Sequence, residues 1–210
     1  MKNIILVISI IFLFSACWED STSPYIEASN KDVLIPLKVG NTWTYNYEID
    51  DGVLNQKTSM TTEVISEFIY NGEKHYRMQH INNSTNQVLS NKFYMINKPD
   101  GYYMINDSGR TEPEIIKLNY PTFKGEVIVE EEYYKLYVED TEYIYTTPMG
   151  KFKCIKYVVL HRYGDVIDAK AENYYAPGIG EVASEYYRNK NNSGVLTLSN
   201  KMVLTSYSLK

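Results

Sequence analysis

Residues 42–48 read Thr-Trp-Thr-Tyr-Asn-Tyr-Glu, and this alternation of polar and aromatic side chains indicates the fold class. Because successive side chains of a β-strand point to opposite faces, the pattern places Trp43, Tyr45 and Tyr47 on one face and the polar residues on the other. A turn signal at Gly40 precedes the stretch. We therefore expect residues 42–48 to open the core of a β-sheet.

The period of two continues beyond this stretch, and the clearest turn signal is Asn71-Gly72. Both central residues of a type I′ turn need positive φ, which Asn and Gly tolerate best. The sequence therefore predicts a hairpin of residues 63–70 and 73–81. A two-residue loop would place Ile65 opposite Met78 and Glu67 opposite Tyr76.

Similar runs, separated by polar or glycine-containing turns, fill the rest of the chain. No window of twelve or more residues after Cys17 has the apolar stripe of an amphipathic helix. We expect an all-β domain of about ten to twelve antiparallel strands with little helix, in a curved sheet, a sandwich or a partly open barrel. A polar break is expected at 139–141, and a bulge or turn at 199–201. The further expected strands are 87–96, 102–105, 127–137, 142–147, 152–163, 173–176, 181–187 and 195–207.

Composition limits the class of protein. The 210 residues include 21 tyrosines, and disordered chains are poor in aromatic residues. The formal net charge is −5, from 21 basic and 26 acidic residues, and it becomes −6 if Lys2 is removed with an export signal. Because nucleic-acid binding depends on a basic surface, we expect no nucleic-acid partner.

The amino terminus has the features of an export signal. Lys2 provides a positive charge, residues 4–14 are apolar apart from Ser9, and Ser15 and Ala16 are small. Eleven helical residues span only about half of a ~30 Å hydrocarbon core, so this segment is too short for a permanent transmembrane helix. We predict residues 1–16 as the signal and 33–210 as one β-rich domain.

The residues Phe14-Ser15-Ala16-Cys17 resemble the lipobox of bacterial lipoprotein signals. The resemblance implies cleavage before Cys17, a diacylglyceryl thioether on Cys17 and an amide-linked chain such as palmitate. It also implies membrane attachment in the cell envelope, with residues 17–32 as a flexible tether. Glu19-Asp20 is similar to signals that direct some lipoproteins to the outer surface, although an acidic tether is also simply soluble. The alternative is a secreted protein in which Cys17 is a chance thiol.

Three phrases resemble a poorly characterised group of exported β-rich lipoproteins: residues 36–45 (PLKVGNTWTY), 147–152 (TPMGKF) and 174–182 (YYAPGIGEV). The resemblance implies an envelope domain of unknown activity, similar to the curved sheets of LolA-type carriers. This chain differs from those carriers because it lacks evident lid helices and has its own lipid site. Physically, Pro177, Gly178 and Gly180 predict a tight corner that lets another backbone approach, with a binding loop as the alternative.

Few residues form a pattern typical of catalysis or metal binding. His75 and His80 lie five apart, which places them on opposite faces of a regular strand, and His161 has no local partner. Cys154 lies in an apolar run and is expected in the core. Glu130-Glu131-Glu132 reads as a solvated sheet edge, and Asp165, Asp168 and Glu172 only loosely match a calcium loop. We expect no enzymatic activity, no cofactor and no metal.

Tyrosines occur as adjacent pairs at 102–103, 133–134, 174–175 and 186–187, so each pair places one ring on each face of a strand. Outward rings could contact a glycan or a protein partner, although tyrosine also suits a half-buried sheet without any ligand. The main hypothesis is a lipid-anchored, non-enzymatic binding or structural module of the cell envelope, at the outer membrane and either periplasmic or surface-exposed. An alternative is a carrier or chaperone for a hydrophobic lipid or lipoprotein, which predicts a continuous apolar cavity. A more remote alternative is a glycan hydrolase, which needs two carboxylates across a cleft.

Overall fold

The computed structural model describes residues 25–50, 55–106, 114–190 and 194–210. These residues form twelve strands in a single sheet. None of the described residues belongs to a helix long and apolar enough to cross a bilayer. The strands are β1 (Thr42–Asp50), β2 (Asn55–Tyr70), β3 (Glu73–Asn82), β4 (Gln87–Lys98), β5 (Gly101–Asn106), β6 (Glu114–Asn119), β7 (Val127–Glu130), β8 (Tyr134–Thr147), β9 (Gly150–Tyr163), β10 (Val166–Ala176), β11 (Gly180–Asn189) and β12 (Leu196–Ser208).

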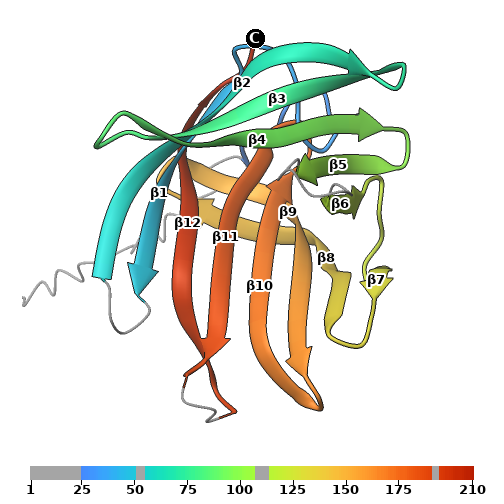
Figure 1. Cartoon of the computed structure of the whole chain (residues 1–210), viewed down its shortest axis with the longest axis vertical. Coiled ribbons are helices and arrows are strands. Elements are labelled where there is room, and N and C mark those ends of the chain that lie inside the picture. Colours follow the sequence, from blue (N-terminus) through green and yellow to red (C-terminus); the bar gives the residue numbers. More distant parts are fainter. Residues whose placement is uncertain (1–24, 51–54, 107–113, 191–193) are drawn as a thin grey trace, which may run out of the picture.

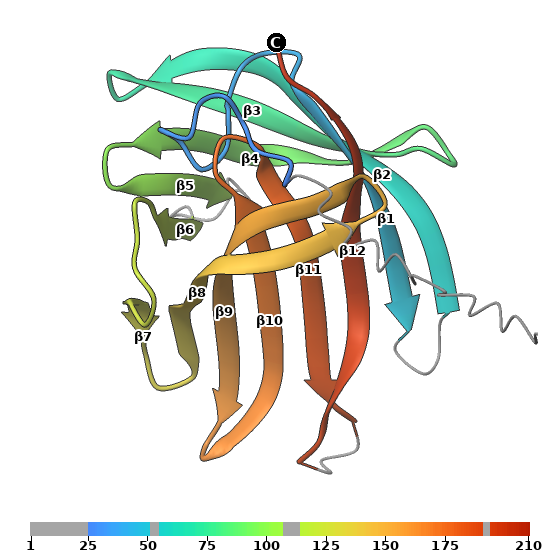
Figure 2. The ribbon, with the colours of Figure 1, turned by 180° about the vertical axis from the view of Figure 1, so that it is seen from behind.

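The sheet is an antiparallel meander that curls into a barrel. Strands that follow one another in the chain pair in the sheet, except β6 and β7. Because β1 also pairs with β12, the order is β6-β5-β4-β3-β2-β1-β12-β11-β10-β9-β8-β7. The two edge strands, β6 and β7, lie on the same side of the molecule (Figure 1; Figure 2). The all-β prediction is confirmed, and of the three predicted architectures the partly open barrel is the one present.

The stretch that indicated the fold class forms β1, at the middle of the sheet. Trp43 pairs with Thr62 of β2 on one side and with Tyr207 of β12 on the other. Trp43 is 2% exposed and Tyr45 is 4% exposed, whereas Tyr47, nearer the end of the strand, is only half-buried. The alternating aromatic residues therefore anchor the strand that joins the two halves of the barrel.

The predicted hairpin at Asn71-Gly72 is confirmed, with φ of 51° at Asn71 and 79° at Gly72. Glu67 lies opposite Tyr76, as expected. The expected pairing of Ile65 with Met78 is wrong, because Met78 lies opposite Val64. The register shifts between Val64 and Ser66, so Ile65 is the extra residue of a β-bulge, a feature that bends and twists a long strand.

Residues 127–147 differ from the expected pattern in two places. The single strand expected at 127–137 is wrong, because β7 ends at Glu130 and β8 begins at Tyr134. Three consecutive glutamates span this point, and like charges favour a solvated turn. The break expected at 139–141 is also wrong, because β8 runs through it with register shifts around Asp140. Bulges there bend the strand without ending it.

The bend gives the barrel a second layer. The second half of β8 and the first half of β9 cross the outer face of β10–β12 (Figure 2). The rings of Tyr143 and Tyr145 pack on Tyr174 of β10, with centroids 5.0 and 4.5 Å apart. These aromatic contacts bury outward-facing side chains that would otherwise be in water.

The segment before β1 closes one end of the barrel. Leu34 is 1% exposed and Ile35 is 7% exposed. Asn97 of β4 donates from Nδ2 to the Ile35 carbonyl at 2.8 Å, which ties the segment to the sheet. Part of the expected tether also lies against the domain, since Ile26 N–H donates to the Lys151 carbonyl at 2.8 Å and Ile26 forms a parallel bridge with Phe152. Residues 17–24 lie outside the described residues.

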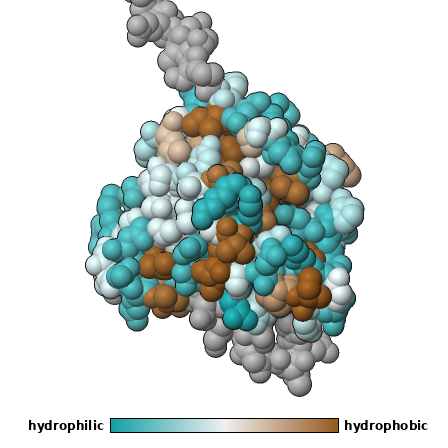
Figure 3. All heavy atoms as spheres, turned by 90° about the horizontal axis from the view of Figure 1, so that it is seen from above, coloured by the Kyte–Doolittle hydropathy of each residue, from teal (hydrophilic) through white to brown (hydrophobic). Residues whose placement is uncertain are grey.

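The outer surface seen from above is mixed in polarity. Figure 3 shows apolar patches on this face that are separated by polar side chains. This face therefore offers no continuous apolar surface, and the larger apolar space is found inside the barrel.

Candidate functional site

The barrel interior contains a cavity of about 830 Å³. This volume lies within the range of roughly 300–1,000 Å³ that is typical of small-molecule sites. Both edge strands contribute to its wall, so the cavity reaches the seam where the sheet is not closed. Most of its wall is apolar or aromatic, from Met95, Tyr102, Met104, Ile115, Ile116, Leu118, Val129, Tyr134, Leu136, Val159, Ala171 and Tyr175.

Polar side chains occupy only a few places in the wall: Lys117, Glu131, His161, Asn173 and Glu181. Lys117 forms an ion pair with Asp100 at 2.7 Å. The ring of His161 packs edge-on against Tyr134, with centroids 5.5 Å apart. Asn173 accepts a hydrogen bond from Ser184 at 2.9 Å. Apolar area with a few fixed polar groups is the usual composition of a ligand pocket.

Glu181 is the exception among these polar residues. It follows Gly180 directly and is the residue of β11 that lines the cavity among the described residues. Burial raises the pKa of its carboxyl from 4.5 to about 8. Glu181 is only half-buried, because it lines the cavity, and none of the ion pairs or side-chain hydrogen bonds found among the described residues involves its carboxyl.

The corner at residues 177–180 positions Glu181. Trp43 donates from Nε1 to the Ile179 carbonyl at 2.6 Å, and the Tyr45 hydroxyl donates to the Glu181 carbonyl at 3.2 Å. The first and third phrases of the sequence therefore meet at the closed end of the barrel. Tyr47 lies further along β1, opposite Met202, and has no part in this contact.

Gly178 explains why this corner needs glycine. Its φ is +76°, and a Cβ there would overlap the carbonyl oxygen of Asn30. Gly178 N–H also donates to the Val33 carbonyl at 2.8 Å. Gly180 has a φ of +111°, next to the indole of Trp43. Pro177 and these two glycines thus form the close backbone approach expected of a corner, and the binding-loop alternative receives no support from these contacts.

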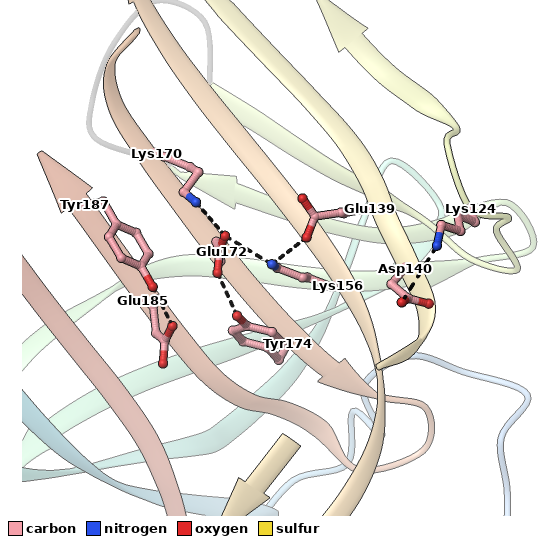
Figure 4. A network of polar contacts seen from close by, with 9 residues as sticks. All are labelled: Lys124, Glu139, Asp140, Lys156, Lys170, Glu172, Tyr174, Glu185 and Tyr187. Atoms are coloured by element: carbon pink, nitrogen blue, oxygen red, sulfur yellow. Dashed lines mark hydrogen bonds and ion pairs between the residues drawn. The ribbon is translucent and has the colours of Figure 1, made fainter. Parts of the chain in front are cut away.

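A polar network covers the outer face of β10 (Figure 4). Glu172 accepts from Lys170 and from the Tyr174 hydroxyl, each at 2.7 Å, and pairs with Lys156 at 3.1 Å. Lys156 also pairs with Glu139 at 2.5 Å. Burial opposes ionisation of Glu172, but these hydrogen bonds hold its pKa below the usual value. The carboxylate is therefore already satisfied, and the network joins β8 and β9 to β10.

Asp165, Asp168 and Glu172, which only loosely match a calcium loop, have different surroundings. Glu172 is held in the network above, whereas Asp165 lies in the turn before β10 and Asp168 is exposed. Among the described residues no three His, Cys, Asp or Glu side chains gather as metal ligands would.

The remaining candidate residues, His75, His80 and Cys154, make packing or hydrogen-bonding contacts within the fold. His75 is buried against Phe68, and His80 contacts the Thr62 hydroxyl through Nδ1 at 2.9 Å. Cys154 is completely buried, and burial raises the pKa of its thiol to about 12. A thiol that stays protonated in the core is unreactive, which agrees with its expected packing role.

In the tyrosine pairs 102–103 and 174–175 the two rings face opposite sides of the sheet, whereas Tyr133 lies before β8 and not in a strand, so the expectation is wrong for the pair 133–134. Tyr102 and Tyr175 line the cavity, whereas Tyr103 and Tyr174 point outward. Tyr103 contributes to an outer hollow of about 480 Å³ together with aromatic residues of β2–β4. A glycan or protein partner for the outward rings stays a prediction.

Together the fold and the cavity define an open antiparallel β-barrel with an apolar interior. No family model matches the sequence, and no curated protein matches it. Two solved structures share the fold: a predicted exported protein of Bacteroides fragilis with a YmcC-like fold and a predicted lipoprotein of Parabacteroides distasonis. The first is 17% identical over 83% of this chain and 98% of its own, with a TM-score of 0.58. The second is 14% identical over 85% of this chain and 100% of its own, with a TM-score of 0.52.

Sequence reasoning did not single out Glu181. The available signal was a charged residue inside an otherwise apolar and glycine-rich phrase, Gly178-Ile179-Gly180-Glu181-Val182. The alternation of polar and apolar residues could not show which face of the sheet Glu181 lies on, because the pairing register between β10 and β11 shifts at Tyr174 and Tyr175. Cys17, the predicted lipidation site, lies outside the described residues.

Proposed function

We propose that this protein is a lipid-anchored component of the bacterial cell envelope that holds an apolar ligand inside its open barrel. The observation that supports it most is the apolar cavity between the two halves of the sheet. A structural module would gain stability from a closely packed interior, whereas a carrier needs space and an entrance. The cavity therefore favours the carrier over a purely structural role.

The seam between β6 and β7 is the entrance in this proposal. At one end the seam is held together, since Asn119 of β6 donates to Glu126 at 2.6 Å and accepts from the Tyr157 hydroxyl at 2.8 Å through its carbonyl. Beyond that point β6 and β7 both line the cavity without pairing with each other. An apolar molecule can enter there without breaking the barrel's strand ladders.

The proposal assigns binding rather than catalysis to the cavity. The charged and histidine side chains in its wall come from β6, β9, β11 and the turn after β7, and no hydrogen bond joins one of them to another among the described contacts. Acid–base or nucleophilic catalysis needs such groups within hydrogen-bonding reach of each other or of a common substrate atom.

Filling the cavity is expected to abolish binding of an apolar probe. Ala171 faces the cavity from β10, between Val159 and Tyr186 on the neighbouring strands. Ala171→Trp places an indole in the space and should weaken binding of the neutral dye N-phenyl-1-naphthylamine by about tenfold or more. Dye fluorescence on titration is the measurement.

The matched control is Val166→Trp, which adds the same side chain at an exposed position of the same strand. This variant should bind the dye as the wild type does, and circular dichroism should show the same β-spectrum for both variants. Equal dye affinity in wild type and Ala171→Trp, with both folded, would contradict binding in the cavity.

The anchor has its own test. Metabolic labelling with an alkyne-tagged palmitate should mark the wild-type protein and not Cys17→Ala, because acylation of this class needs the cysteine thiol. Two acyl chains or more are needed for stable membrane attachment, so the wild type should sediment with membranes. Labelling of both proteins would show that the lipid is attached elsewhere.

A further inference from the structure

The Glu181 carboxyl lies in an apolar wall without a charged partner, and this suggests which charged group the ligand has. Burying a carboxylate without a partner is costly, and buried charges in proteins are normally paired. Of the other charged residues in the cavity wall, Lys117 pairs with Asp100, and Glu131 carries the same charge as Glu181 and is exposed just after β7. His161 packs on Tyr134, and neither it nor Lys117 affects the pKa of Glu181.

Aromatic rings surround the same carboxyl. Tyr102 and Tyr175 line the cavity beside Glu181, and Tyr45 lies behind it. Tyr175 lies directly opposite Glu181 in the pairing of β10 with β11, and the Tyr45 hydroxyl donates to the Glu181 carbonyl at 3.2 Å, so both residues are its neighbours. The Glu181 charge also contributes, after burial, to raising the pKa of all three hydroxyls. A carboxylate together with tyrosine rings is the combination that proteins use to hold organic ammonium groups.

We propose that Glu181, Tyr102 and Tyr175 bind the ammonium group of an amphiphilic ligand whose apolar chain extends along the cavity toward the seam. The inference rests on the proposed binding function and adds the chemical class of the ligand. In the empty cavity the Glu181 carboxyl holds its proton at neutral pH. The arriving cation stabilises the carboxylate, so the proton leaves to solvent and the ion pair forms without a change of net charge in the cavity.

Probes with an octyl chain test the charged group of the ligand separately from binding in the cavity. Octylamine and 1-octanol have the same apolar chain, and only the amine carries a cation at neutral pH. Titration calorimetry of the full-length protein should give octylamine an affinity about tenfold or more above that of 1-octanol. Repeating the titration in two buffers with different ionisation heats should show release of about one proton per octylamine.

Glu181→Gln should remove both the preference for the amine and the proton release, whereas the exposed Glu132→Gln should keep both. Equal affinity of the wild type for octylamine and 1-octanol would overturn the ammonium inference and leave cavity binding intact. Failure of every octyl probe to bind would instead contradict the proposed function. Tighter binding of octanoate than of octylamine would also overturn the inference.

Discussion

Replacing Trp43 with alanine is expected to lower the free energy of unfolding by about 3–5 kcal/mol. Trp43 is 2% exposed at the closed end of the barrel, and its indole contacts Gly180. The substitution removes a large apolar side chain and leaves a void between β1 and the corner. It also leaves the Ile179 carbonyl, which accepts from Nε1 at 2.6 Å, without its partner.

Urea denaturation is the measurement for this prediction. Tyr47→Ala on the same strand is the control, because its half-buried ring takes no part in the corner and should cost clearly less. Trp43→Phe should fall between the two, since it keeps most of the packing and loses only the hydrogen bond. A loss below about 1 kcal/mol for Trp43→Ala would mean that the corner does not depend on this side chain.

Replacing Glu181 with glutamine is expected to change how stability depends on pH. Burial raises the pKa of this carboxyl from 4.5 to about 8 in the folded protein. Below about pH 4.5 the carboxyl is protonated in both the folded and the unfolded chain. Between that pH and about 8 the unfolded chain loses the proton while the folded chain keeps it, so wild-type stability falls as the pH rises.

Glutamine has the same shape and no charge, so Glu181→Gln should not show this loss. The variant should be more stable than the wild type at pH 8 by about 3–5 kcal/mol, with a much smaller difference at pH 4. Thermal and urea unfolding of the ligand-free protein at both pH values measure this difference in stability. The control Glu132→Gln should show the same pH dependence as the wild type. Equal stability of Glu181→Gln and wild type at pH 8 would show that the carboxyl is well solvated in the cavity.

Local signals allowed much of the strand pattern to be predicted from the sequence. The aromatic alternation at 42–48 gave β1, and Asn71-Gly72 gave the β2–β3 hairpin, because each depends only on residues close in the chain. The apolar run around Cys154 likewise gave β9. Such elements can be predicted without knowing which residues pack against them.

Features that depend on distant residues were not predictable in the same way. The pairing of β1 with β12 joins residues 42–49 to 200–208, and no short-range signal encodes it. Bulges at Ile65 and around Asp140 shift the register, which depends on packing against the neighbouring strands. The six residues of β6 were missed because Glu114–Asn119 shows no clear alternation. The cavity depends on the β1–β12 pairing, on the bulges and on β6 together, so it was not predictable from local signals either.

The central claim is that an apolar ligand occupies the cavity inside the barrel, and methionine methyl groups can report on its binding directly. Met95 and Met104 line the cavity, whereas Met149 and Met202 do not. With ¹³C-methyl methionine labelling, titration with 1-octanol should shift the NMR signals of Met95 and Met104 to saturation and leave Met149 and Met202 in place. Unchanged Met95 and Met104 signals at saturating octanol, or shifts confined to the other two, would contradict the account.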